Sequence, residues 1–190
     1  MGRNEIITMI LPNQKKSICL IGMPGVGKSF IGRNLAKTLN FKFIDTDDLI
    51  IKQKGKPLQQ ILDQLGREKF INLETKSILS LNNLKKMVIS PGGSLVYSPR
   101  AVQFLKNNTV IIYLADSKKR IFKRIKNLHE RGIVGLKEKG FDRLYRERER
   151  LYEKFADIKI DLSKMQIRDK DLKAQQVIKI ILNKLKQLSR

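Results

Sequence analysis

A glycine-rich segment near the start of the chain has the residue types that bind nucleotide phosphates. Residues 22–29, GMPGVGKS, match the pattern G-x-x-x-x-G-K-[ST] at every fixed position. Glycines let backbone N–H groups turn toward phosphates, and a helix that begins at Lys28 adds the positive end of its dipole. In such a loop the lysine reaches the β- and γ-phosphates and the serine hydroxyl ligates Mg²⁺. The segment predicts that a nucleotide is bound by Gly22, Pro24, Gly25, Val26, Gly27, Lys28, Ser29 and the following Phe30.

Two carboxylates stand where the next apolar run ends. Asp45 and Asp47 follow residues 41–44 at positions i and i+2. Ligand sites of parallel sheets gather at the carboxyl ends of the strands, so both side chains should lie beside the phosphate loop. One carboxylate there can hold magnesium through water, and the other can accept a proton from a substrate hydroxyl. The alternative is that they cap the helix that follows, which Asp47 could also do.

The phosphate loop alone does not identify the reaction, because GTPases, motor ATPases and small kinases all use it. A GTPase of this size would carry Asn-Lys-x-Asp after a strand, and a motor ATPase would have a strand that ends in Asp-Glu. The sequence contains neither motif in such a position. This favours a small kinase.

Short apolar runs alternate with helical stretches along the chain and indicate the elements that position these residues. The run 17–21 precedes a stretch, 28–39, whose apolar residues recur at helical spacing. The same alternation predicts further strands at 41–44, 87–90, 110–114 and 158–160, and further helices at 48–54, 98–105, 117–126 and 172–188. This pattern is typical of an α/β fold in which helices cover both faces of a parallel sheet.

Two segments depart from this alternation. Residues 57–81 have helical periodicity that is interrupted at Gly66, and residues 128–140 are basic and contain three glycines. In a compact domain such an excursion is usually a substrate-binding module or a lid. Because 128–140 has few large apolar residues, we expect it to be mobile without nucleotide and to close when phosphates arrive.

Composition narrows the partners without naming one. Lys and Arg number 40 against 18 Asp and Glu, a net charge of +22 that must attract anions. It leaves a phosphate-handling enzyme and a polyanion binder both open, although lysines spread over the whole length favour a general lysine bias. Cys19 is the only cysteine, which excludes an internal disulfide, and no apolar run approaches the roughly 20 residues of a membrane span. We expect a cytoplasmic protein without a membrane partner.

The chain resembles the shikimate kinase family of small-metabolite kinases over nearly all of residues 16–185. Three blocks carry the resemblance: 22–36 with 43–47 (FIDTD), 90–94 (SPGGS), and Arg148 with LYEKFAD at 151–157. The resemblance implies a P-loop kinase, a three-layer αβα sandwich with a five-stranded parallel sheet and a mobile lid. It also implies ATP and Mg²⁺ as cofactors and transfer of the γ-phosphoryl group to the 3-hydroxyl of shikimate, a step of aromatic amino-acid biosynthesis.

The resemblance implies a role for individual residues as well. Asp47 would orient and deprotonate the acceptor hydroxyl, Arg124 would stack on adenine, and Arg131 would close over the phosphates from the lid. Arg148 would grip the carboxylate of the acceptor. The implied sets are catalytic Lys28, Asp47 and Arg131, acceptor-binding Asp47, Gly92, Gly93 and Arg148, and metal-binding Ser29 and Asp45.

Departures from the family pattern fall on the acceptor side. The family's substrate helix reads Phe-Arg-x-x-Glu and uses its arginine on the carboxylate of shikimate, whereas FINLE at 70–74 has Ile71 there. Ser94 replaces the third glycine of the substrate loop, and Pro91 replaces a threonine. Arg67 could supply the missing charge or lie in solvent.

Two further hypotheses therefore stay open. One is a paralogue that phosphorylates another hydroxy acid, such as homoserine or gluconate. The other, motivated by the charge, is a catalytically silent nucleotide- or RNA-binding protein. We expect residues 1–15 to be an N-terminal extension and 16–190 to form one kinase domain, with acceptor-binding helices at 57–81 and a lid at 128–140. We also expect a monomer whose partner is a small hydroxy acid rather than nucleic acid.

Overall fold

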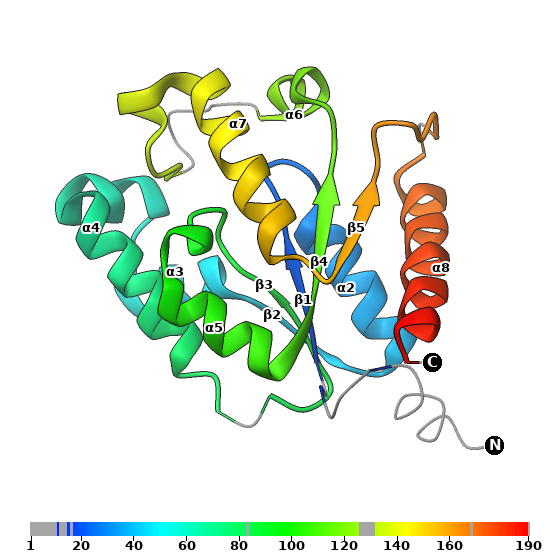
Figure 1. Ribbon diagram of the computed structural model, residues 1–190. Coiled ribbons are helices and arrows are strands. Elements are labelled where there is room, and N and C mark those ends of the chain that lie inside the picture. Colours follow the sequence, from blue (N-terminus) through cyan, green and yellow to red (C-terminus); the bar gives the residue numbers. More distant parts are fainter. Residues whose placement is uncertain are drawn as a thin grey trace.

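The computed structural model describes residues 11, 15, 17–82, 84–125, 132–167 and 169–189. This part of the chain contains one sheet of five parallel strands in the order β2-β3-β1-β4-β5 (Figure 1). The strands are β1 (Ser17–Ile21), β2 (Lys42–Asp45), β3 (Met87–Ser90), β4 (Thr109–Ala115) and β5 (Ile158–Asp161). All five match the apolar runs of the sequence within one or two residues at each end. The prediction of a five-stranded parallel sheet is confirmed.

Helices cover both faces of this sheet and make three layers (Figure 1). α2 and α8 contact each other on one face, while α5 and α7 pack against β4 on the other. The helices are α2 (Lys28–Leu39), α3 (Thr46–Lys54), α4 (Leu58–Leu79), α5 (Pro99–Asn108), α6 (Lys118–Arg124), α7 (Leu136–Phe155) and α8 (Lys170–Leu188), with a 3₁₀ turn, η1 (Leu95–Tyr97). The α/β sandwich predicted from the alternation is therefore present. Within the described residues, no helix is long and apolar enough to cross a bilayer.

The neighbouring strands β1 and β4 lie in the interior of the molecule. Every residue of β1 and β4 is buried, because helices lie on both faces and leave no side for polar residues. Burial of each large aliphatic side chain stabilises the fold by about 1.5–3 kcal/mol relative to exposure. On α8, the apolar stripe of Val177, Ile181 and Leu185 faces the same core and is fully buried.

The register of the parallel strands brings the chemistry-bearing residues to one edge. Asp45, the last residue of β2, pairs with Ser90, the last residue of β3. Ile21 at the end of β1 pairs with Tyr113 of β4. The phosphate loop, the Asp45–Asp47 segment and the glycine pair of residues 92 and 93 therefore leave the sheet side by side.

The expected lid differs from the structure in its second half. Residues 128–131, with Arg131, lie outside the described residues, and 132–135 form a connection. From Leu136 onward the chain is helical, so the expected end of the lid at Gly140 falls inside α7. Gly140 has φ 69° and ψ 162°, which breaks the helix without ending it. Gly66 interrupts α4 in the same way, at φ 71° and ψ 170°, as predicted.

Candidate active site

The phosphate loop wraps around the side chain of Lys28. The Lys28 Nζ donates to the carbonyl oxygens of Gly22, at 3.0 Å, and Met23, at 3.3 Å. Gly22 has φ +147°, and a Cβ there would lie 2.6 Å from the carbonyl oxygen of Leu114, so only glycine fits. Burial lowers the pKa of Lys28, while the carboxylates of Asp47 and Asp45 act in the opposite direction. The ammonium is thus held inside the loop, opposite two acids.

Ser29 and Asp45 form a pair of oxygen ligands next to that ammonium. The Ser29 Oγ donates to Asp45 Oδ2 at 2.6 Å. The other carboxylate oxygen, Asp45 Oδ1, accepts from the backbone N–H of Asp47 at 3.1 Å and caps α3. Asp45 rather than Asp47 therefore provides the helix cap, and Asp47 is left free of that task. Mg²⁺ prefers oxygen ligands, and a hydroxyl and a carboxylate beside a phosphate site are ligands of this kind. Two protein ligands are enough, because Mg²⁺ usually keeps several of its waters.

A cavity of about 350 Å³ opens from this edge of the sheet. Its wall combines the phosphate loop, the end of β2, α3, α4, the loop after β3, the connection 132–134 and Arg148 of α7. Among the residues singled out in the sequence, the following line it: Pro24, Gly25, Lys28, Ser29, Asp45, Asp47, Gly92, Gly93 and Arg148. The structure therefore brings the phosphate-binding and acceptor-binding candidates together around one space.

Two carboxyl groups face each other across Gly92 in this cavity. A Cβ on Gly92 would lie 2.8 Å from Asp47 Oδ1 and would overlap Glu74 Oε1, so the glycine makes room for both acids. Burial, with a further contribution from Asp45, raises the pKa of Asp47 to about 6. Burial and the charge of Asp47 raise the pKa of Glu74 to about 8. Glu74 is therefore protonated near neutral pH, while Asp47 is ionised and available as a base.

Arg148 is a buried cation in the wall of this cavity. Only 1% of the residue is exposed, and its Nη2 donates to the carbonyl oxygen of Val134 at 2.7 Å. Its Nε has no hydrogen-bond partner among the described residues. Beneath it, the hydroxyl of Tyr152 donates to the carbonyl oxygen of Gly93 at 2.7 Å and fixes the glycine loop. A buried guanidinium that lines a polar cavity suits an anionic ligand such as a carboxylate.

The departures on the acceptor side have a structural consequence at Glu74. Ile71 packs in an apolar cluster with Phe70 and Val134 instead of lining the cavity. The buried Glu74 carboxyl accepts from Ser94 Oγ at 2.6 Å. Its strong burial and its contact with Ser94 were missed in the sequence, although the Phe70-to-Glu74 spacing could have pointed to it. Arg67 does not line this cavity, since its guanidinium lies over the ring of Tyr97, 5.2 Å from the centroid.

A second cavity, of about 530 Å³, lies on the other side of the phosphate loop. Four further nucleotide candidates line it, namely Val26, Gly27, Phe30 and Arg124, whereas Gly22 lines neither cavity. Arg120 of α6 and two lysines of α8 complete its charged wall. An elongated ligand with phosphates in the loop would reach both cavities. Of all the predicted site residues, only Arg131 lies outside the described part of the chain.

Comparison with known proteins identifies the family to which this arrangement belongs. Residues 24–186 match the family model for shikimate kinase. The chain belongs to the shikimate kinase family. As a member, it is an ATP-dependent phosphotransferase with an alcohol acceptor, so the predicted family, fold and enzyme class are confirmed.

Relatives and solved structures of the shikimate kinase family cover most of the chain. A shikimate kinase of Caldanaerobacter subterraneus is 37% identical over 150 residues, which are 78% of this chain and 87% of that protein. One from Sulfurihydrogenibium is 32% identical over 172 residues, covering 90% and 99%. The structure of Acinetobacter baumannii shikimate kinase in complex with shikimate superposes with a TM-score of 0.79 at 28% identity, covering 96% and 98%. That of Aquifex aeolicus gives 0.74 at 30% identity, covering 89% and 95%.

Proposed function

We propose that this member of the shikimate kinase family transfers the γ-phosphoryl group of ATP to the 3-hydroxyl of shikimate. The observation that carries the proposal is the single cavity in which Lys28, Asp47 and Arg148 share one wall. It offers a cation for phosphates, a base for a hydroxyl and a buried cation for a carboxylate. The shikimate complex of the Acinetobacter baumannii relative supports this acceptor.

Each residue of the cavity has a defined task in this reaction. Asp47 accepts the proton of the acceptor hydroxyl as the oxygen attacks the γ-phosphorus, and the bond to the β-phosphate oxygen breaks. Lys28 stabilises the negative charge on the transferring group, as Arg131 would from the lid. Ser29 and Asp45 would hold Mg²⁺, which when bound neutralises phosphate charge. Gly92, Gly93 and Arg148 position the acceptor, and Arg124 faces the nucleotide base from the second cavity.

A paralogue with another acceptor, such as homoserine or gluconate, is the second candidate. It is favoured by the contact between Ser94 and Glu74 and by the apolar packing of Ile71, which together leave Arg148 as the family-matched cation on the acceptor wall. A silent nucleotide- or RNA-binding role has only the net charge in its favour. We further propose that residues 16–190 act as one kinase domain, as a monomer in the cytoplasm.

Steady-state kinetics of two variants separate the two kinase hypotheses. Arg148→Met should raise the KM of the true acceptor by roughly ten- to a hundredfold, because a charge-assisted contact of about 1.5–3 kcal/mol is lost. The KM of ATP should barely change. If shikimate is the acceptor, Ile71→Arg should lower its KM by up to about tenfold, since an arginine one turn before Glu74 adds a second cation.

Arg150→Met is the matched control, because Arg150 is an exposed arginine of the same helix. It should leave both KM values unchanged. In a pocket rebuilt for another molecule, Ile71→Arg would bury a guanidinium without a ligand, lower stability and bring no gain with shikimate. That result, with no shikimate phosphorylation by the wild type, would favour the paralogue.

A further inference from the structure

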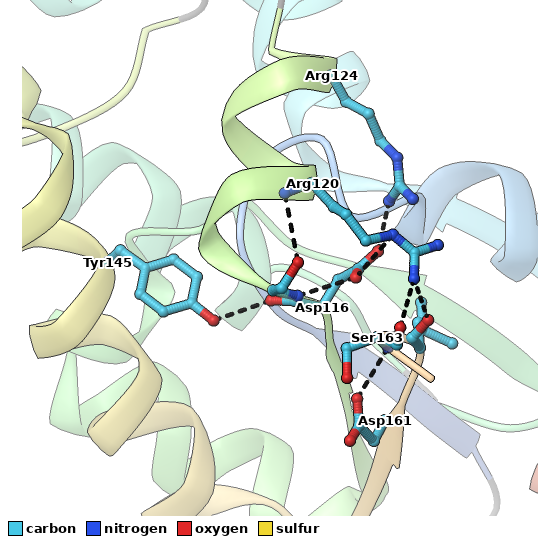
Figure 2. A network of polar contacts seen from close by, with 8 residues as sticks. Asp116, Arg120, Arg124, Tyr145, Asp161 and Ser163 are labelled. Atoms are coloured by element: carbon cyan, nitrogen blue, oxygen red, sulfur yellow. Dashed lines mark hydrogen bonds and ion pairs between the residues drawn. The ribbon is translucent and has the colours of Figure 1, made fainter. Parts of the chain in front are cut away.

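Asp116 follows β4 with its carboxylate buried between the two arginines of α6 (Figure 2). Its side chain is 0% exposed. Asp116 Oδ1 accepts from the backbone N–H of Ser117 at 2.9 Å and lies 3.3 Å from Arg120 Nε. Asp116 Oδ2 accepts from Arg124 Nη1 at 2.7 Å. A buried carboxylate is costly unless it is paired, and here both oxygens are engaged by charged or backbone donors.

Asp116 and its partner Arg120 are tied to two other parts of the fold, α7 and the connection between β5 and α8. Figure 2 shows the hydroxyl of Tyr145 on α7 pointing at the carbonyl oxygen of Asp116, to which it donates at 2.8 Å. Arg120 Nη1 donates to the carbonyl oxygens of Leu162 and Ser163, at 2.9 and 2.7 Å, in the connection between β5 and α8. The partner of Arg124 is thus anchored in the scaffold. The seven-residue helix α6 alone would not fix a long side chain.

The surroundings of Arg124 would otherwise drive its guanidinium away from the second cavity. Arg120, Lys170 and Lys173 line the same wall, so four cations share it. Burial lowers the pKa of Lys173, and the neighbouring Arg120 and Arg124 lower it further, whereas Asp116 acts against them. Of the three charged groups that shift the pKa of Lys173, Asp116 is the one that carries a negative charge. Without its charge, Arg124 would gain by turning toward solvent, where like charges are screened.

We propose that Asp116 is a positioning residue for the nucleotide, which holds the guanidinium of Arg124 at the wall of the second cavity before the nucleotide arrives. The proposal rests on the proposed function in one respect, namely that the base of ATP occupies this cavity. A side chain that is already fixed loses no rotamer freedom when the ligand binds. The planar cation then meets the face of the base at little entropic cost.

Isothermal titration of the full chain with ADP and with pyrophosphate tests this role. Both ligands place two phosphates in the loop, but only ADP has a base. Asp116→Asn keeps the size of the side chain and removes its charge. We expect it to raise the Kd of ADP by about three- to tenfold, the range of a cation–aromatic contact, and to leave the Kd of pyrophosphate unchanged. Asp161→Asn is the matched control, since that carboxylate accepts from the backbone N–H of Ser163 instead.

A second variant separates positioning from structural support. If Asp116 acts through Arg124, Asp116→Asn should weaken ADP binding no further in an Arg124→Ala background. Additive losses, an equal loss for ADP and pyrophosphate, or an unchanged Kd of ADP would each overturn the proposal. Should Asp116→Asn fail to fold, Arg124→Lys must by itself raise the Kd of ADP and leave the Kd of pyrophosphate unchanged. Lysine keeps the positive charge but lacks the planar guanidinium. Full ADP affinity in that variant would also overturn it.

The titration needs no acceptor. A wild-type chain that binds ADP and shows these differences, yet phosphorylates no shikimate, would contradict the proposed acceptor and support the role of Asp116. A wild-type chain that binds pyrophosphate and ADP equally well would contradict the role of Asp116 without bearing on the acceptor.

Discussion

At the scale of single residues, the acids of the acceptor cavity make the most direct connection between burial and chemistry. Asp47 accepts a proton only when it is ionised, and its pKa is raised to about 6 by burial and by Asp45. We expect kcat/KM to fall as the pH drops through about 6, because kcat/KM follows the ionisation of the free enzyme. Asp47→Asn should lower kcat by about 10²–10⁴-fold and abolish this acid limb. A pH profile of both proteins, with the limb retained in the variant, would show that another group is the base.

Glu74 should affect the stability of the fold in the opposite sense to an ordinary surface acid. Its pKa is about 8 in the folded chain against 4.5 for a free side chain, mainly because of burial. The folded state keeps a proton that the unfolded chain releases between these values. The free energy of unfolding should therefore decrease as the pH rises from about 4.5 to 8.

Glu74→Gln removes this titration and retains an oxygen that can accept from Ser94. Between about pH 5 and pH 8 the variant should lose less stability than the wild type, by an amount on the order of a few kcal/mol. Urea unfolding at the two pH values measures the difference. Glu68→Gln, an exposed acid on the same helix, is the control and should behave as the wild type. Equal pH dependence in wild type and Glu74→Gln would mean that Glu74 is ionised when buried.

Single residues also show where sequence reasoning succeeds and where it ends. The phosphate loop and the Asp45–Asp47 pair could be predicted, because their spacing is local and each follows a strand. The contact between Glu74 and Ser94 could not be predicted, since it joins α4 to the loop after β3 and depends on three-dimensional packing. The burial of Asp116 was missed for the same reason, because its partners come from α6 and α7.

At the scale of elements, strands and α7 differ in how clearly the sequence shows them. Strands that are buried on both faces read as short apolar runs, so all five were predicted. α7 was not predicted, although it spans Leu136–Phe155. Its buried face consists of Leu144, Tyr145, Arg148 and Tyr152. Three of these four side chains end in a polar group, so the helical period does not stand out as an apolar pattern.

The connection 132–135 links α3 and α4 to Arg148 of α7. Val134 is fully buried in a cluster with Ile50, Ile61 and Phe70, and its carbonyl oxygen holds Arg148. Val134→Ala should destabilise the fold by about 1–3 kcal/mol through lost apolar burial. It should also raise the KM of the acceptor more than that of ATP, because Arg148 loses a fixed anchor.

Thermal unfolding and steady-state kinetics check this expectation, with Leu188→Ala as a control at an apolar residue exposed near the end of α8. Unchanged acceptor KM in a destabilised Val134→Ala protein would show that this connection supports the fold and not the site.

At the scale of the whole molecule, the parallel sheet explains where the site lies, and the net charge explains why anionic ligands are attracted to it. Strand ends from distant parts of the sequence meet at one edge, so residues from Pro24 to Arg148 can converge on a single cavity. A charge of +22 favours the approach of anions, and both ATP and a carboxylate acceptor are anions. The sequence predicted this architecture and the family, whereas the choice of acceptor depends on the packing around Glu74 and Ile71.

The most direct test of the central claim is product analysis with shikimate as the only acceptor. Purified wild-type chain is incubated with ATP, Mg²⁺ and shikimate, and both ADP and phosphorylated shikimate are quantified by ³¹P NMR. Lys28→Ala, which removes the ammonium held in the phosphate loop, serves as the control for a contaminating kinase. We expect equal amounts of the two products with the wild type and none with Lys28→Ala. A wild-type chain that binds ATP and forms no phosphorylated shikimate would contradict the claim.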